Sequence, residues 1–321
     1  MSKKMRYEIV LLIFLFLAAC NSKTPNEYVL DEKDLVPEGI AYSAEKDAFY
    51  LTSVTKSKIV MVDQKTGKQT DFIRENEFGY KPGVGIWVDD KQNQIHALGG
   101  YFLLSDSLSS LYTFDSNTNQ LLKRYDLSDK HFLNDMVIDK KGNMYLTDTK
   151  DASVFLLRKG GDSLELFYKS PEIEFPNGIA ISDDNKKLYV ASMPKGIEIL
   201  DISKKRILNT TDTFGISQGI DGLEFYKGHL YAIQNGVQDN GFNFRKLNLN
   251  KAKDKIVGVD LIDSNNPDLY VPLTFCFANN KAIVIGNSNL GHLNQKTMRF
   301  SESDTNELPQ GKPSGYQNNL S

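Results

Sequence analysis

The sequence predicts an all-β fold, a six-bladed β-propeller with four-stranded blades that is closed by an N-terminal strand. Two observations predict it. A short figure, in which a polar residue and a glycine or acidic residue open an apolar run, recurs at intervals of 43 to 52 residues, a spacing typical of propeller blades. No segment shows a convincing helical period. The figure begins at positions 38, 84, 134, 177, 221 and 273, with weaker copies at 84 and 273.

The third repeat shows the four strands of one blade. Apolar runs are expected as strands at residues 136–138, 144–146, 154–157 and 164–167. Residues 140–143 and 159–162 supply turns, because glycine and asparagine tolerate a positive φ. The first, second, fourth and fifth repeats give the same pattern.

The sixth repeat is shorter and predicts three strands, near residues 274–277, 282–285 and 293–300. Residues 301–321 are rich in Ser, Asn, Gly and Pro and predict a disordered tail. An incomplete last blade would leave an unpaired strand edge. We expect the strand candidate at residues 27–30 to close the ring.

The N-terminal residues are typical of a targeting segment. Residues 1–20 combine a basic start, an apolar segment at 9–17 that is too short to span a bilayer, and small residues before Cys20. This resembles a bacterial lipoprotein signal peptide, with Cys20 lipidated and residues 21–26 as a tether. The alternatives are an ordinary secretory signal with a chance cysteine, or a retained membrane anchor. The prediction places the protein in the bacterial cell envelope, with residues 27–300 as a propeller outside the cytoplasm that meets the membrane only through the lipid.

Length, composition and net charge limit the classes of function that the chain can have. The 321 residues suit a single large propeller domain. A charged fraction of 25% argues against disorder, and a net charge of -3 gives no support to a nucleic-acid partner. Cys276 lies in an apolar run and is expected to be an inert buried thiol. We expect a monomer that acts on a small molecule.

Four of the six repeats open with an oxygen-bearing side chain. The first strand of each blade lines the central channel, so residues at the strand starts converge at one end. Carboxylate and amide oxygens suit a hard divalent cation such as calcium, and the absence of His and Cys argues against zinc and copper. The alternative is that these residues only form turns. The predicted ligands are Glu38, Asn134, Asn177 and Asp221.

The chain resembles the senescence marker protein/gluconolactonase family, which includes regucalcin and, more distantly, diisopropyl fluorophosphatase and the paraoxonases. The resemblance covers about residues 27–300. It rests on the order of the four predicted ligands along the chain, Glu, Asn, Asn and Asp. It also rests on the local sequence around them, at residues 37–39, 134–135, 176–178 and 221–222. It implies a catalytic calcium held by the four predicted ligands, with Asp221 as nucleophile or general base.

One departure concerns the substrate. Sugar-lactone members usually carry an arginine just before the first Asn, where this chain has residues 131–133, His-Phe-Leu. An aldonolactone substrate is therefore in doubt. Tyr101, His131 and His292 are candidates for contacting substrate, and the alternative for each histidine is a solvated or structural residue.

Two functions remain open at this point. One is a calcium-dependent hydrolase of a lactone or related ester, with Asp221 as the catalytic residue. The other is a non-catalytic lipoprotein propeller that binds a ligand or an envelope protein. A propeller hosts both, so the fold alone does not decide.

Overall fold

The computed structural model describes residues 25–102, 108–128, 130–209, 216–236, 241–264, 266–294, 300, 308 and 312–316. The predicted signal peptide, Cys20 and residues 21–24 of the tether lie outside these ranges, and their roles stay predictions. Within the described ranges the helices are three short 3-10 turns: η1 (Glu77–Gly79), η2 (Pro171–Ile173) and η3 (Leu290–His292). None of the helices in these ranges is long and apolar enough to cross a membrane.

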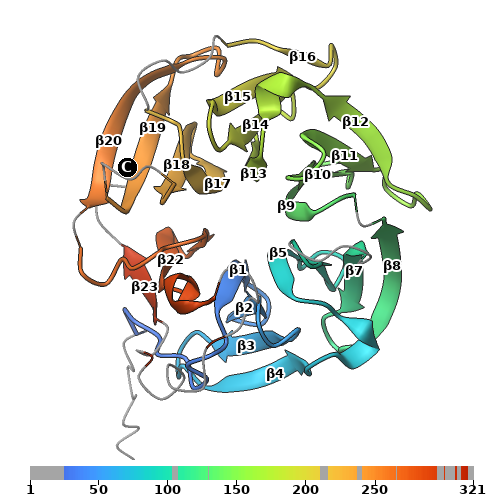
Figure 1. Ribbon diagram of the computed structural model, residues 1–321, viewed down its shortest axis with the longest axis vertical. Helices are drawn as coiled ribbons and strands as arrows, with labels where there is room; N and C mark the ends of the chain where they lie inside the picture. Colours follow the sequence, from blue (N-terminus) through green and yellow to red (C-terminus); the bar gives the residue numbers. More distant parts are fainter. Residues whose placement is uncertain are drawn as a thin grey trace, which may run out of the picture.

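Antiparallel sheets arranged in a ring make up the described part of the chain (Figure 1). In each sheet the strands follow one another in chain order. The first two sheets contain β1 (Pro37–Ser43), β2 (Ala48–Ser53), β3 (Ile59–Asp63), β4 (Gln69–Ile73), and β5 (Gly83–Asp89), β6 (Gln94–Gly99), β7 (Ser109–Asp115), β8 (Leu121–Leu127). The third and fourth contain β9 (Leu133–Ile138), β10 (Met144–Asp148), β11 (Ser153–Leu157), β12 (Glu165–Lys169), and β13 (Pro176–Ile181), β14 (Lys187–Ser192), β15 (Gly196–Asp201), β16 (Arg206–Ile207). The last two contain β17 (Ile220–Tyr226), β18 (His229–Gln234), β19 (Asn243–Leu249), β20 (Ile256–Ser264), and β21 (Phe275–Ala278), β22 (Lys281–Asn287), β23 (Lys312–Tyr316).

The first strand of every sheet faces the centre of the ring, as Figure 1 shows for β1, β5, β9, β13 and β17. Each of these strands contacts the first strand of the next sheet, and β21 contacts β1. The ring is therefore closed, and the all-β propeller prediction is confirmed.

The prediction of six four-stranded blades is wrong. The structure has five four-stranded blades, and the remaining sheet, β21–β22–β23, has three strands. Its third strand comes from residues 312–316, inside the segment predicted as a disordered tail, and not from residues 293–300. Residues 295–299 of that predicted strand lie outside the described ranges. The reason for the error is that β23 has no alternation of apolar residues and is held by backbone pairing with β22, such as Ile283 with Gly315.

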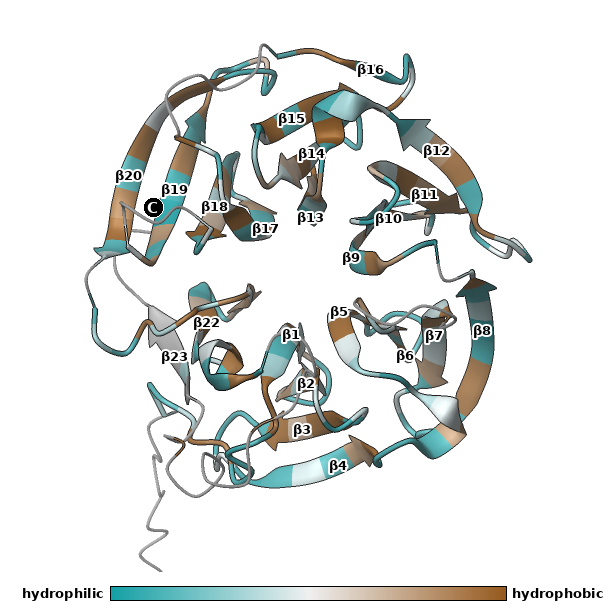
Figure 2. Cartoon of the chain, viewed as in Figure 1, coloured by the Kyte–Doolittle hydropathy of each residue, from teal (hydrophilic) through white to brown (hydrophobic). Residues whose placement is uncertain are grey.

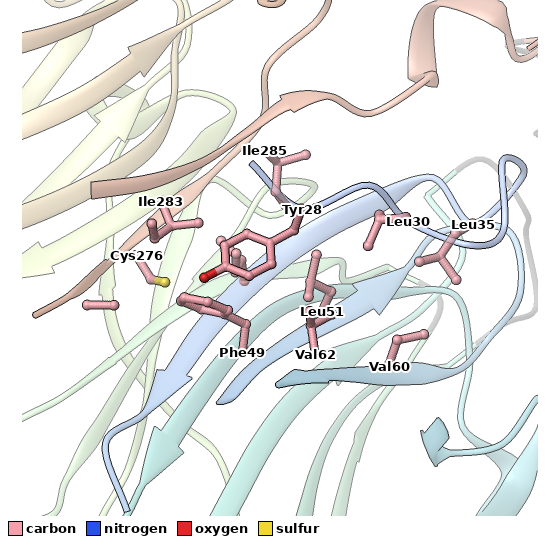
Figure 3. Close-up of a cluster of buried hydrophobic side chains, with 12 residues drawn as sticks. Tyr28, Leu30, Leu35, Phe49, Leu51, Val60, Val62, Cys276, Ile283 and Ile285 are labelled. Carbon is pink, nitrogen blue, oxygen red and sulfur yellow. The ribbon is translucent and has the colours of Figure 1, made fainter. Parts of the chain in front are cut away.

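Residues 27–30 lie at the predicted seam, but they are not a strand of the described structure. The N–H of Tyr28 donates to the carbonyl of Pro313 in β23 at 3.0 Å, and the Tyr28 and Leu30 side chains are buried. Figure 3 shows them packed between the first blade and the last sheet, next to Phe49, Ile283 and Cys276. The segment thus joins the two ends of the ring mainly through its side chains, and Cys276 is buried as predicted.

The outer strands carry apolar residues into solvent. Along β12 and β20 hydrophobic and hydrophilic residues occur together (Figure 2). Leu166 in β12, and Val257 and Leu261 in β20, are exposed. The strongly buried residues therefore lie between the blades and toward the centre, where the functional side chains are placed.

A glycine lets neighbouring central strands approach closely. A Cβ on Gly39 would lie 2.4 Å from the carbonyl oxygen of Val84, and one on Gly178 would lie 2.4 Å from that of Asp221. Real Cβ atoms do not approach this closely, so any larger residue would push the blades apart. At Gly39 and Gly178 the glycine of the repeat figure is thus required by packing around the channel.

Candidate functional site

The four predicted ligands occupy equivalent places in the fold. Each is the second residue of the central strand of its blade: Glu38 in β1, Asn134 in β9, Asn177 in β13 and Asp221 in β17. Because these strands run in the same direction around the ring, the residues lie at one end of the channel. Burial, with the charge of Asp221 added, raises the pKa of Glu38, and the Asn177 amide hydrogen-bonds to Asp221. The fold therefore brings ligands from distant blades together.

Three oxygen atoms of this group are buried and unsatisfied. Glu38 Oε2, Asn134 Oδ1 and Asp221 Oδ1 have no hydrogen-bond partner among the residues that the structure describes. Leaving a buried polar oxygen unpaired costs about 1–3 kcal/mol for each group. Such atoms need a partner that a protein side chain does not provide, and a hard cation is one.

Neighbouring side chains fix the direction of two of these oxygens. Asn134 Nδ2 donates to Thr149 Oγ1 at 2.9 Å, and Thr149 Oγ1 donates to the carbonyl of Pro176 at 2.7 Å. Asn235 Nδ2 donates to Asp221 Oδ2 at 2.6 Å and lies 2.7 Å from the carbonyl of Pro272. With one atom of each head group held, the other atom is left to point at a ligand.

The channel contains more carboxyl groups than the sequence analysis counted. Burial raises the pKa of Glu38 well above its usual range, and it raises that of Asp221 to about 6. Burial, with the charge of Asp221 added, raises the pKa of Asp135 to about 7, and burial with the charge of Asp135 raises that of Glu224 to about 8. A bound cation would favour the ionised form of every one of these groups.

The donor set fits calcium. Two carboxylates and an amide carbonyl, at Glu38, Asp221 and Asn134, present free buried oxygens, and the Asn177 amide contacts Asp221. Oxygen donors with surplus negative charge suit a hard divalent cation better than a soft one. Among the described residues, no cysteine or histidine forms part of this set.

Asp135 was not predicted as a site residue, although it follows Asn134 in the repeat figure. It stands where the other repeats have Gly39 and Gly178. Its carboxylate accepts hydrogen bonds from the N–H groups of Met136 at 2.7 Å and Ile179 at 3.1 Å, the latter in the next central strand. The signal that would have found it is the replacement of glycine by aspartate in one repeat only.

Asn235 and Glu224 were also missed. Asn235 follows β18 and reaches Asp221 across the blade, a contact that depends on strand pairing. Glu224 lies within β17, where alternation with apolar neighbours made it resemble an ordinary solvated strand residue. Neither position carries a local sequence signal.

His131 lies beside the site end of the third blade. Its Nδ1 is 2.5 Å from Oδ2 of Asp148, which is fully buried at the end of β10 and also accepts the N–H of Phe132 at 2.9 Å. The carbonyl of Tyr101 lies 3.5 Å from Nζ of Lys150, two residues after Asp148. Thus Tyr101 and His131 flank the same blade end, and Asp148 orients the imidazole.

His292 is on the last sheet's side of the ring. It ends η3, is exposed, and places its ring 5.2 Å from that of Tyr270. Tyr270 in turn lies 6.3 Å from the ring of Phe242. These rings form an aromatic edge that could contact a substrate, so His292 stays a candidate for that role.

A second group with metal-ligand chemistry lies at the third blade. Ligand atoms of His131, Asp148 and Asp151 lie within 4.8 Å of one another. The oxygens already have partners, because Asp148 is bonded as described above and Lys169 Nζ forms an ion pair with Asp151 Oδ1 at 2.5 Å. Burial works to raise the pKa of Asp151, but the hydrogen bond and charge of Lys169 lower it overall. This group is satisfied by the protein itself, unlike the channel oxygens.

Residues 36–225, more than half of the chain, match the family described as the SMP-30/Gluconolactonase/LRE-like region. The chain belongs to this family. The matched region includes all four predicted ligands. No curated protein matches the chain at a significant level.

Several solved structures are similar to the chain. Luciferin-regenerating enzyme matches with 15% identity over 90% of this chain and 94% of its own, at a TM-score of 0.60. Virginiamycin B lyase from Staphylococcus aureus matches with 14% identity over 81% of this chain and 80% of its own, at 0.57. PQQ-bound aldose sugar dehydrogenase from Streptomyces coelicolor matches with 13% identity over 91% and 99%, at 0.59. At these identities the likeness shows the propeller fold and no shared activity.

Proposed function

We propose that this member of the SMP-30/gluconolactonase family is an exported, calcium-dependent hydrolase of a lactone or related ester. The observation that carries the proposal is the set of buried, unsatisfied oxygens on Glu38, Asn134 and Asp221 at one end of the channel. Family membership supports it, since the family description includes gluconolactonase. Calcium, export and the substrate class are parts of the proposal.

The ligands proposed for the cation are Glu38, Asn134, Asn177 and Asp221. A calcium ion at this place would act as a Lewis acid toward the carbonyl oxygen of the substrate. Its removal would leave the carboxylates without a counter-charge in a buried channel, where their pKa values are raised.

Asp221 is the proposed catalytic residue. With a pKa of about 6, it is roughly ten times more ionised than protonated at neutral pH, even without a cation. Asn235 fixes one carboxylate oxygen, so the other is directed at the reactants. In hydrolysis, the carboxylate takes a proton from the attacking water as the oxygen bonds to the carbonyl carbon. The proton then passes to the alkoxide that leaves when the C–O bond breaks. Direct attack by the carboxylate is the alternative role.

One observation favours the second candidate function, a propeller that only binds a ligand. Residues 131–133, the stretch where sugar-lactone members usually have an arginine, are His-Phe-Leu here, and Phe132 is buried with its ring 5.2 Å from that of Phe102. This apolar pair cannot hydrogen-bond to a sugar hydroxyl. The missing arginine therefore favours the binding function, and a hydrolase with this site is expected to act on a substrate less polar than an aldonolactone.

The test is turnover of a lactone and ester panel by chelator-stripped protein, with and without calcium. We expect calcium to restore activity on at least one apolar lactone, and Asp221→Asn to remove it. Asp162→Asn is the matched control, because its exposed carboxylate lies in the turn between β11 and β12, where it pairs with Lys123 of the outer strand β8. If calcium-loaded protein turns over no lactone, ester or phosphotriester, the binding function replaces the hydrolase.

A further inference from the structure

The opposite end of the central strands forms a second mouth. A cavity of about 620 Å³ lies at the ends of β9, β13 and β17 and in the turns that follow them. Its walls include Ile138, Ile181 and Phe225, each four residues after a proposed cation ligand in the same strand. At about 3.3 Å for each strand residue, the two mouths are roughly 13 Å apart. The cavity is therefore separate from the cation site.

The apolar part of this cavity is fixed in place. The Tyr226 ring stacks on Phe277 with centroids 3.9 Å apart and an interplanar angle of 13°. Its hydroxyl donates to Asn280 Oδ1 at 2.6 Å. Phe225 stacks on Tyr189, with centroids 5.8 Å apart. A rigid aromatic wall of this kind suits a flat apolar body, because little side-chain entropy is lost on binding.

The charged part of the cavity is basic. Lys140 and Lys227 are exposed at its rim, and neither forms an ion pair with any residue that the structure describes. Lys140 Nζ donates to the backbone carbonyl of Asp183, while the Asp183 carboxylate pairs with Lys253. Lys227 Nζ lies 5.2 Å from the Tyr226 ring centroid. The lining thus holds two lysines and one aspartate, and because that aspartate is paired with Lys253, the charge of the two lysines stands beside the apolar wall.

We propose that this far mouth, lined by Lys140, Lys227, Ile138, Ile181, Phe225 and Tyr226, is a second ligand site for a small organic anion with a flat apolar body. An aromatic carboxylate, sulfonate or phosphate ester satisfies both halves of the cavity: the ring packs on the apolar wall and the anion accepts from the lysines. The site does not depend on the cation at the other mouth.

The test uses the fluorescent anion 8-anilinonaphthalene-1-sulfonate and its uncharged analogue N-phenyl-1-naphthylamine as probes of the full chain. We expect the sulfonate to bind saturably and at least tenfold more tightly than the uncharged probe. Lys140→Ala and Lys227→Ala should each weaken its binding several-fold, and the double variant more than tenfold. Lys186→Ala is the matched control, because this exposed lysine lies in the same turn as Asn185 but does not line the cavity.

The difference between variant and control removes any contribution from apolar residues elsewhere, such as those exposed on β20. Equal affinity of the double variant and Lys186→Ala would overturn the proposal. So would equal affinity for the two probes, which would mean that charge plays no part. Binding that vanishes on chelation or in Asp221→Asn would place the probe at the cation site and also overturn it. The failure of hydrolysis would leave this result unaffected.

Discussion

The two mouths of the channel are built from the same central strands but have opposite chemistry. At the strand starts, Glu38, Asn134 and Asp221 bury oxygens that no described residue satisfies. At the strand ends, Lys140 and Lys227 lie in an open cavity with apolar walls. The difference shows that the repeat determines where a residue lies, whereas the charge of the side chain varies along the same strands. Under the two proposals, one propeller presents a cation site and an anion site on one axis.

The largest effect expected from this comparison is on catalysis. Asp221→Asn keeps an oxygen at the site end but removes the charge, so kcat on a responsive lactone should fall by several orders of magnitude. The control Asp162→Asn should retain full activity. Calcium content must be measured on both variants, because the substitution can also weaken the binding of the ion. Normal turnover by metal-loaded Asp221→Asn would remove this residue from the reaction.

The acidic mouth should also make metal-free protein sensitive to pH, unlike the far mouth. A carboxyl whose pKa is raised on folding binds more protons in the native state, so the free energy of unfolding falls as pH rises. For Asp221 the window runs from its ordinary value of 3.8 to about 6, and the loss is about 3 kcal/mol. Chemical denaturation with chelator present at pH 4.5 and 7.5 should measure about 2 kcal/mol of this loss, because the rest occurs below pH 4.5. Asp221→Asn should flatten the trend, and a wild-type stability that rises over this range would contradict the assignment.

A smaller effect is expected where a neighbour only orients a ligand. Thr149→Val keeps the shape of the side chain but removes the hydrogen bonds to Asn134 and Pro176. A lost hydrogen bond of this kind is worth about 0.5–1.5 kcal/mol, so calcium affinity should fall several-fold. Calorimetric titration checks this, with Thr118→Val in an exposed turn as the control. An unchanged affinity would mean that Asn134 does not ligate.

The smallest effects are expected for the candidate substrate contacts. His131→Ala and His292→Ala should raise KM several-fold and leave kcat nearly unchanged, because the described contacts of these histidines are with Asp148 and Tyr270 and not with the four proposed ligands. Asp148→Asn should reproduce the His131 effect, since it orients the imidazole. A large fall in kcat for either histidine variant would give that residue a chemical role.

The sequence predicted those parts of the molecule that repeat. The central strands and the four oxygen-bearing residues at their starts follow a local pattern that recurs in each blade. Strand β23 was missed because Pro313 and Gly315 are placed by backbone pairing with β22, which leaves no apolar pattern. Asn235 was missed because its contact with Asp221 exists only after two strands pair. Local composition does not reveal which distant strands pair. The prediction errors therefore occur at residues that such pairing places.

The central claim is that the unsatisfied oxygens of the site end hold a cation. The most direct test is the melting temperature of protein stripped with chelator, confirmed metal-free by elemental analysis, and then titrated with calcium. Binding to the native state alone predicts a rise in stability of about 2.7 kcal/mol at a hundredfold excess over Kd. Glu38→Gln, which replaces one ligand charge, should weaken the rise. A melting curve that calcium leaves unchanged in verified metal-free protein would contradict the claim and leave the four residues as turn formers.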